Sequence, residues 1–302
     1  MKLLTCVTML LLAAPSSAAQ PARDTLVVSA AWLQQHVNDP NLVLLHVGNK
    51  ETYDAGHLPG ARYVDYRSTL AAVEGANGLT LEMLPADVLH DRLAALGLSD
   101  TSRVVVYQSD EMWTPSTRVM LTLDYAGLSN VSWLDGGQKA WTAAGGSLTP
   151  VIPPQKPGAL SALRLRPVVA DADFVNSHLH TPSFAIVDAR SPAFYDGSRT
   201  GGRAPAEHKT GHIAGAVNVP FDSFTTQDVQ LKPVAEIAAA FTKAGVKPGD
   251  TVITYCHIGQ QATATLFAAR TLGYRVMLYD GSFEDWSRRN LPVENPSAKK
   301  HE

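Results

Sequence analysis

Cysteine is scarce in this sequence: only Cys6 and Cys256 occur among its 302 residues. Cys6 lies within an apolar N-terminal stretch, Leu3 to Ala14, and we expect it to be removed with that stretch. The remaining thiol then has no disulfide partner, and one cysteine without a tight histidine cluster does not suit a thiolate metal site. Cys256 is therefore either a buried, inert thiol or one kept for its reactivity.

Runs of basic residues and long apolar segments are also missing. The formal net charge is -3, and no basic run stands out, which argues against nucleic acid as the main partner. Beyond the N-terminal stretch, no apolar segment is long enough to span a bilayer. With 45% hydrophobic residues, the mature chain is expected to form two soluble globular domains, at about 150 residues each.

The N-terminus has the three parts of a secretory signal peptide. Met1 and Lys2 give a positive start, the apolar stretch follows, and the small residues Pro15 to Ala19 supply a cleavage site. We therefore expect residues 1–19 to be a cleaved signal and the protein to be periplasmic or secreted. The alternative is the frayed apolar N-terminus of a cytosolic protein.

The chain contains two copies of one unit. Five features recur in the same order: an apolar strand, a Gly-His-hydrophobic-x-Gly-Ala box, a second apolar strand, an Asp-Gly turn and a tryptophan after it. The two sets are Val43–Val47, His57, Arg103–Tyr107, Asp135 and Trp141, then Ala185–Ala189, His212, Thr251–Tyr255, Asp280 and Trp286.

Each copy alternates short apolar strands with amphipathic helical stretches, of which Leu84–Leu96 and Val234–Ala244 are the clearest. Such alternation predicts an α/β fold in which a central parallel sheet is flanked by helices on both faces. We expect an N-terminal domain over residues 24–146, a proline-rich linker over 147–167 and a C-terminal domain over 168–297. The two domains are expected to pack face to face and form a cleft.

Cys256 opens a short loop between the strand Thr251–Tyr255 and a predicted helix. The N–H groups of such a loop and the positive end of the helix favour an anion at the cysteine sulfur. Alignment from the strand places Gln108 opposite Cys256, in a loop that is three residues longer, carries two acids and has no thiol. Only the second copy is therefore expected to be catalytic.

These ordered motifs resemble the tandem-domain rhodanese sulfurtransferases, which include thiosulfate and 3-mercaptopyruvate sulfurtransferases. The resemblance covers nearly all of the mature chain. It implies two rhodanese domains, with the first as a non-catalytic partner, and no cofactor or metal. It further implies that Cys256 takes sulfur from a small anionic donor as a persulfide and passes it to a thiophilic acceptor, cyanide or a thiol, in a ping-pong scheme.

The resemblance also suggests the other site residues. Arg190 matches an arginine that faces the cleft and binds the anionic donor, and Asp188 has a supporting role. His257 either assists proton transfer or only lines the pocket. His57 is a possible supporting residue, although a structural turn is the more ordinary role for both His57 and His212. The loop that binds the donor and persulfide comprises His257, Ile258, Gly259, Gln260, Gln261 and Ala262.

The loop departs from the family patterns, so the donor stays open. It has neither the Arg-Lys pair of thiosulfate-preferring loops nor the Gly-Ser-Gly type associated with mercaptopyruvate. Phe194 stands where some members have a second arginine. Arg199 and Arg203, in the insertion 196–209, either replace that arginine or are simply solvated.

Three other functions are weighed against sulfur transfer. A cysteine-dependent phosphatase needs an arginine six residues after the cysteine, where this chain has Ala262. A carrier that holds a persulfide on Cys256 without turnover remains open. So does a redox sensor whose thiol forms sulfenic acid or a mixed disulfide.

Overall fold

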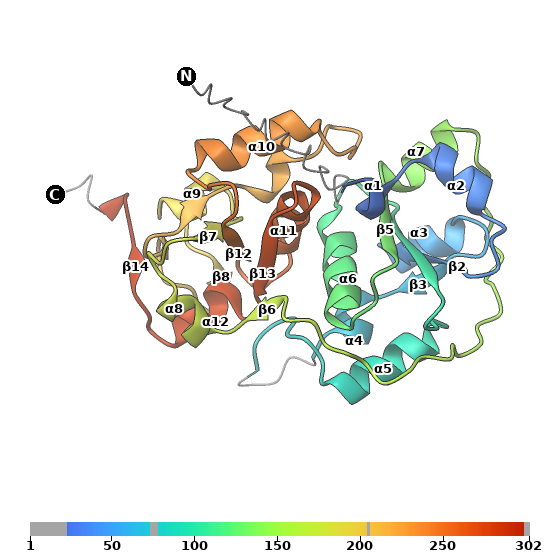
Figure 1. Cartoon of the computed structure of the whole chain (residues 1–302), viewed down its shortest axis with the longest axis horizontal. Coiled ribbons are helices and arrows are strands. Elements are labelled where there is room, and N and C mark those ends of the chain that lie inside the picture. The colour runs from blue at the N-terminus through green and yellow to red at the C-terminus, as the bar shows by residue number, and fades with distance from the viewer. Residues whose placement is uncertain (1–22, 73–77, 204–205, 299–302) are drawn as a thin grey trace, which may run out of the picture.

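The computed structural model describes residues 23–72, 78–203 and 206–298, which form two lobes side by side (Figure 1). The expected signal peptide and Cys6 lie outside these residues. In the described part of the chain, no helix has both the length and the apolar character needed to cross a membrane.

The first lobe is one sheet with helices on both faces. Its elements are α1 Arg23–Leu26, β1 Val27–Val28, α2 Ala30–His36, β2 Leu42–Val47, α3 Lys50–Ala55, β3 Arg62–Val64, α4 Tyr66–Leu70, α5 Ala86–Ala95, β4 Arg103–Gln108, α6 Thr114–Tyr125, β5 Val131–Leu134 and α7 Gly137–Ala143.

The second lobe repeats this order and adds short strands. Its elements are β6 Val169–Ala170, α8 Ala172–Ser177, β7 Phe184–Asp188, α9 Pro192–Tyr195, β8 Gly202–Arg203, β9 Ala206–Glu207, β10 His212–Ile213, β11 Val217–Asn218, η1 Phe221–Ser223, α10 Val234–Lys243, β12 Thr251–Tyr255, α11 Ala262–Thr271, β13 Arg275–Tyr279, α12 Ser282–Arg288 and β14 Val293–Glu294.

The two main sheets have the same topology. The strand order is β1-β5-β4-β2-β3 in the first lobe and β6-β13-β12-β7-β11 in the second, and every pairing within them is parallel. All five residues of the central strand β12 are buried, as are the last five of β4, because helices cover both faces. The predicted fold class is confirmed.

The two clearest predicted helices are present with slightly narrower bounds. Helix α5 begins at Ala86, after Pro85, and α10 begins at Val234, after Pro233. A proline at this position supplies a φ suited to helix entry and needs no hydrogen bond from its nitrogen. Each helix buries one stripe, Leu89 with Leu93 in α5 and Ile237 with Phe241 in α10.

The linker runs along the outside of the first lobe before it enters β6 (Figure 1). It has no helix or strand over residues 150–168, yet backbone hydrogen bonds fasten it to the lobe. The Gly158 N–H donates to the Ala94 carbonyl at 2.8 Å, and the Arg166 N–H donates to the Tyr125 carbonyl at 2.9 Å. The linker is therefore fixed against the surface rather than free.

The lobes meet through α6 and α11, which lie next to each other (Figure 1). Trp113 and Trp133 pack edge-on against Phe267 at ring distances of 6.2 and 6.0 Å, within a hydrophobic core that includes residues of both lobes. Burying such large side chains contributes about 1.5–3 kcal/mol each, so the halves stabilise one another.

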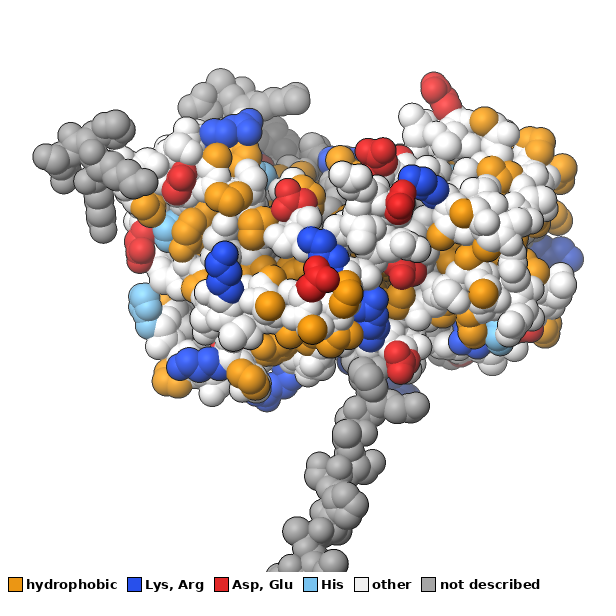
Figure 2. Space-filling view, turned by 90° about the horizontal axis from the view of Figure 1, so that it is seen from above, with side chains coloured by type: hydrophobic (Ala, Val, Ile, Leu, Met, Phe, Trp, Pro, Cys, Tyr) orange, Lys and Arg blue, Asp and Glu red, His pale blue; other side chains and the backbone are white. Residues whose placement is uncertain are grey.

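The Asp-Gly turns make reciprocal contacts across this interface. Asp135 of the first lobe accepts a 2.7 Å hydrogen bond from the Leu231 N–H, and Asp280 of the second accepts a 2.7 Å bond from the Met83 N–H. Each copy thus uses the same turn to hold a segment of the other. On the face drawn in Figure 2, acidic and basic side chains are intermingled rather than separated by sign.

Candidate functional site

Cys256 lies at the carboxyl end of β12, and α11 begins six residues later at Ala262. We call residues 256–261 the Cys256 loop. Its thiol is unpaired and only 1% exposed. Gly259 has a φ of +77°, and a Cβ there would lie 2.8 Å from the Asp280 carbonyl oxygen, so both the turn and the close approach require glycine.

The amides of the Cys256 loop are free to bind an anion. Within the described residues, the N–H groups of His257 to Gln261 donate to no protein acceptor. They precede the N-terminus of the ten-residue helix α11, whose dipole adds positive potential. This arrangement can stabilise a thiolate or persulfide, in line with the prediction for this loop.

Helix α12 holds the loop from the other side. The Cys256 N–H donates to Ser282 Oγ at 3.3 Å, and the Cys256 carbonyl accepts from the Phe283 N–H at 3.0 Å. The His257 carbonyl accepts from the Glu284 N–H, also at 3.0 Å. The first turn of α12 thereby sets the position of the cysteine.

Arg190 is held in a buried ion pair with Asp188. Its Nε lies 3.0 and 3.1 Å from the two carboxylate oxygens, and its Nη2 lies 2.5 Å from Oδ2 and 2.8 Å from the Gly211 carbonyl. Tyr255 donates to the same carboxylate at 2.8 Å. Burial alone would lower the pKa of Arg190, but the Asp188 charge outweighs it and the pKa is raised.

The position of Arg190 suits two roles at once. The negative charge of a Cys256 thiolate also raises the pKa of Arg190, after the larger effect of Asp188. The Arg190 guanidinium also stacks 4.1 Å from the centroid of the Phe283 ring. Arg190 therefore forms a structural ion pair with Asp188, and donor binding by Arg190 stays a prediction.

His257 is enclosed by residues of the second lobe. Phe194 meets its ring edge-on at 4.5 Å, and His208 places Nδ1 3.4 Å from its Nδ1. Burial, followed by the charge of Arg190, lowers the pKa of His257 to about 3. The imidazole is thus neutral near pH 7 and a weak base, because protonating it would bury a second cation beside Arg190.

The insertion 196–209 contacts the site through residues other than the two arginines suggested by the sequence. The sequence suggested Arg199 or Arg203 as its contribution, whereas the structure places His208 and Gly201 against His257. The Arg199 guanidinium lies over the Phe194 ring at 4.7 Å, and its charge also disfavours protonation of His257. The side chain of Arg203 is outside the described part of the chain.

His57 and His212 occupy equivalent structural turns. His57 stacks on Tyr53 and places its ring nitrogens 2.7 Å from the Tyr53 carbonyl and 3.2 Å from the Val151 carbonyl. His212 stacks on Tyr195 and lies 2.7 Å from its carbonyl. These contacts lie away from the Cys256 loop and favour the structural turn over a supporting role for His57.

The first lobe supplies side chains to the Cys256 loop that the sequence did not point to. Gln260 Oε1 accepts from Tyr66 Oη at 2.6 Å and from Arg67 Nη2 at 3.1 Å, while its Nε2 donates to Thr114 Oγ1 at 3.1 Å. Arg118 donates to the Gly259 carbonyl at 3.1 Å. The one signal in the sequence is that Arg118 is a charged residue among the apolar residues Val119, Met120 and Leu121, in the segment that forms α6.

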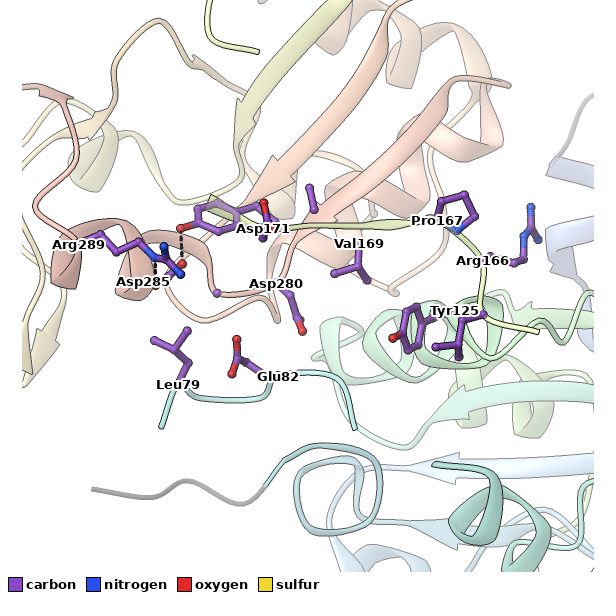
Figure 3. A pocket seen from close by; sticks show the side chains of 14 residues that line it. Leu79, Glu82, Tyr125, Arg166, Pro167, Val169, Asp171, Asp280, Asp285 and Arg289 are labelled. Carbon is purple, nitrogen blue, oxygen red and sulfur yellow. Dashed lines mark hydrogen bonds and ion pairs between the residues drawn. The ribbon is translucent and has the colours of Figure 1, made fainter. Parts of the chain in front are cut away.

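A cavity of about 510 Å³ lies between the lobes beside this contact (Figure 3). Glu82 and Tyr125 of the first lobe face Asp280 and Asp285 of the second across it. Burial, reinforced by the charges of Asp280 and Asp285, raises the pKa of Glu82. Cys256 does not line this cavity. In the described residues, no three His, Cys, Asp or Glu side chains gather as metal ligands would.

Both halves of the chain match a known protein family. Residues 29–144 and 171–289 each match the family model described as Rhodanese-like domain. A thiosulfate sulfurtransferase of Azotobacter vinelandii is 31% identical over 271 residues, which cover 89% of this chain and 97% of that protein. The sulfur carrier protein TtuD of Thermus thermophilus is 29% identical over 291 residues, covering 93% and 99%.

Solved structures show the same fold. The anaerobic ergothioneine biosynthesis enzyme from Chlorobium limicola, in complex with its natural substrate trimethyl histidine, superimposes with a TM-score of 0.82. The match covers 92% of this chain and 72% of that one, at 23% sequence identity.

Proposed function

Because this chain belongs to the rhodanese-like domain family and is a tandem-domain sulfurtransferase, we propose that Cys256 carries the transferred sulfur as a persulfide and that thiosulfate is its donor. The main support is the structure of the Cys256 loop: five consecutive N–H groups without a protein acceptor follow the only cysteine of the described residues. The curated relatives named thiosulfate sulfurtransferase support this donor over 3-mercaptopyruvate.

The proposed reaction has two half-reactions at one sulfur atom. The Cys256 thiolate attacks the outer sulfur of thiosulfate, a sulfur–sulfur bond forms, and sulfite leaves with the electron pair of the broken bond. Cyanide or a thiolate then attacks the outer sulfur of the persulfide, and Cys256 leaves as a thiolate. The negative charge stays near the loop amides throughout, which is where fixed dipoles are most effective.

Arg190 is the group we propose to meet the anionic donor. Since its charge is partly compensated by Asp188, it provides a directional hydrogen-bond donor rather than a strong net positive potential. The neutral His257 beside it is a weak base, so we propose that it lines the pocket and that a thiol acceptor attacks as a thiolate.

A second candidate is a persulfide carrier that passes sulfur to a protein and turns over slowly with small acceptors. The 29% identity to a protein named as a sulfur carrier favours it. Here the partner is a protein thiol, and the persulfide on Cys256 persists until that partner arrives.

We also propose that the protein is exported, with residues 1–19 removed as a signal peptide. Cell fractionation and N-terminal sequencing of the mature protein test this directly. A mature chain that begins at Met1 in the cytoplasm would overturn it.

The activity is tested by incubating the purified protein with thiosulfate and cyanide and following thiocyanate, with 3-mercaptopyruvate as the competing donor. The expected result is turnover with thiosulfate, a mass gain of one sulfur on Cys256 with donor alone, and loss of both in Cys256→Ser. A stable persulfide without turnover would select the carrier. Absence of persulfide from either donor would refute both candidates.

A further inference from the structure

Arg118 is a buried cation of the first lobe whose hydrogen bonds join the two lobes. It lies in α6, is 2% exposed, and donates through Nη1 to the Gly259 carbonyl at 3.1 Å and to Asp280 Oδ1 at 2.8 Å. Its Nη2 donates to the Leu81 carbonyl. A buried guanidinium needs such a set of acceptors, and one of these acceptors is the backbone of the Cys256 loop.

We infer that Arg118 is a positioning residue for sulfur transfer: by holding the Gly259 carbonyl, it turns the Gln260 N–H toward the Cys256 sulfur. This inference rests on the proposed persulfide chemistry of Cys256. The lobe without a nucleophile then completes the anion site of the lobe that has one.

The Gly259 carbonyl and the Gln260 N–H belong to the same peptide unit, so fixing one fixes the direction of the other. A trans peptide unit is planar, and its C=O and N–H point in opposite directions. The Gly259 carbonyl points at the first lobe, where Arg118 binds it, so the Gln260 N–H of the same unit points back into the loop. This N–H is one of the five without a protein acceptor in the described residues.

The surroundings of Arg118 leave that peptide little freedom. Gly259 is at a φ of +77°, a region open to glycine, so its peptide would otherwise rotate readily. On the far side of the peptide, the Gln260 side chain is bound by Tyr66 and Thr114 at 2.6 and 3.1 Å. The first lobe therefore restrains both ends of the unit whose N–H faces the sulfur.

Asp280 fixes the guanidinium itself. One carboxylate oxygen accepts from Arg118 and the other from the Met83 N–H at 2.7 Å. Figure 3 shows Asp280 at the cavity between the lobes, with Glu82 on the opposite wall. Arg118 thus has a defined orientation before any donor binds.

The chain offers a matched control in Arg270. This residue of α11 binds Asp124 of α6 with Nη1–Oδ2 and Nη2–Oδ1 distances of 2.9 and 3.0 Å. The pair joins the same two lobes, with the arginine on the second lobe and the carboxylate on the first, and in the described residues it makes no contact with the Cys256 loop. Loss of Arg270 weakens the docking of the lobes without freeing the Gly259 carbonyl.

The test compares Arg118→Met, Arg118→Lys and Arg270→Met in the full chain. Three quantities are measured: the pH profile of Cys256 alkylation by iodoacetamide, kcat and KM for thiosulfate with cyanide, and the denaturant midpoint. We expect Arg118→Met to lower kcat about 10- to 100-fold, with KM changed less than about threefold. This is less than for complete loss of an anion-stabilising donor, because the Gln260 N–H is misdirected rather than removed. The midpoint of alkylation should move about one pH unit upward, because the thiolate loses a donor.

The two other variants separate positioning from docking. Arg118→Lys should recover part of the kcat loss, since an ammonium can still bind one carbonyl. Arg270→Met should lower the denaturant midpoint and leave the alkylation profile in place. Equal alkylation shifts in Arg270→Met and Arg118→Met, or unchanged kcat and alkylation in Arg118→Met, would overturn the inference.

The inference stays testable if Arg118→Met does not fold, and also if the wild-type protein forms no persulfide. If Arg118→Met does not fold, Arg118→Lys carries the test: a wild-type alkylation profile and kcat in that variant would overturn the inference, and an intermediate shift would support it. If the wild-type protein forms no persulfide, the proposed function fails, whereas the alkylation comparison still decides whether Arg118 positions the loop.

Discussion

The sheets of the two lobes have the same topology, and each central strand carries a buried tyrosine at its carboxyl end. Tyr107 is the last residue but one of β4, Tyr255 is the last of β12, and both make the same contact. Tyr107 Oη accepts the Leu58 N–H at 3.1 Å, and Tyr255 Oη accepts the Ile213 N–H at 3.0 Å. The next residue differs, because Gln108 follows the first tyrosine and Cys256 the second. The tyrosine contact, which both lobes have, supports the fold, whereas the residue after it differs and accounts for the thiol of the second lobe.

The partners of the tyrosines show the same division. Tyr255 donates to Asp188, whereas Tyr107 lies 3.1 Å from Nδ1 of His46, which holds the corresponding place in the sheet. Two residues after Asp188 stands Arg190, and two after His46 stands Gly48. The first lobe thus has a neutral imidazole and a glycine at the two positions where the second lobe has a buried ion pair.

A third difference lies at the turn that faces the loop. Ser282 places its hydroxyl 3.3 Å from the Cys256 nitrogen, and its counterpart in the first lobe is Gly137. The Gln108 side chain fills that space, with Nε2 only 2.8 Å from where a Gly137 Cβ would be. The first lobe therefore has a packed side chain where the second has its anion site. Its contribution to that site comes through α6, whose Arg118 contacts the Cys256 loop.

The largest effect is expected from removing the ion pair that only the second lobe has. Arg190→Met leaves the Asp188 carboxylate buried without its cation and should lower the free energy of unfolding by about 3 kcal/mol or more. The double variant Asp188→Asn with Arg190→Met should be less destabilised than Arg190→Met alone. Denaturant titration measures both, and a double variant as unstable as the sum of the two single variants would refute this account.

The next effect is a loss of stability in acid that both lobes share. Burial lowers the pKa of His46 to about 4 and that of His257 to about 3, so the folded protein resists protonation of both. The unfolded chain binds these protons near pH 6.5. Stability is therefore full above pH 6.5 and falls below it, by about 3 kcal/mol per histidine on reaching pH 4.

His46→Asn and His257→Asn test the two lobes separately. Each should flatten the decline of the unfolding free energy between pH 6.5 and 4, measured by urea titration at several pH values. A decline that neither variant alters would show that other groups cause it.

The fold that the two lobes share could be predicted from the sequence, whereas the contacts between the lobes could not. Strand and turn motifs recur locally, so the duplicated α/β fold and the loop at Cys256 follow from short-range patterns. Arg118, Tyr66 and Thr114 reach Gly259 and Gln260 across more than 140 residues of chain. Apart from the charge of Arg118 among the apolar residues of α6, nothing local distinguishes these side chains from ordinary surface or core residues.

In the insertion 196–209, the sequence also failed to predict which residue contacts His257. Because an anionic donor calls for positive charge, the sequence pointed to Arg199 and Arg203, which either bind the donor or are simply solvated. The structure instead packs the neutral His208 on His257, a contact set by how the insertion folds back. Charge alone therefore identified the segment but not the residue that reaches the site.

A smaller effect is expected from giving the second lobe the turn residue of the first. Ser282→Gly removes the hydrogen bonds to the Cys256 N–H and to the Tyr279 carbonyl, each contributing about 1 kcal/mol. The residue has a φ of +52°, which glycine adopts without strain, and this offsets about 1 kcal/mol of the loss. We expect stability to fall by about 1 kcal/mol and kcat to fall several-fold, as the cysteine is less well held.

Ser282→Ala is the control, because it loses the same hydroxyl and keeps the strained φ. It should be less stable than Ser282→Gly in denaturant titration, with a similar kcat. A glycine variant that is the less stable of the two would contradict the proposed offset.

The smallest effect on turnover is expected from Gln108→Ala, at the position equivalent to Cys256. Gln108 Oε1 accepts from Trp133 Nε1 at 2.8 Å, so its loss leaves a buried N–H unpaired and should cost about 1–3 kcal/mol of stability. In the part of the chain that the structure describes, Gln108 has no hydrogen bond with the Cys256 loop, and kcat for thiosulfate should stay within about twofold of wild type below the unfolding temperature. Paired measurements of melting temperature and kcat separate these expectations. A collapse of kcat in folded Gln108→Ala would mean that the first lobe contributes chemistry of its own, beyond the positioning that Arg118 provides.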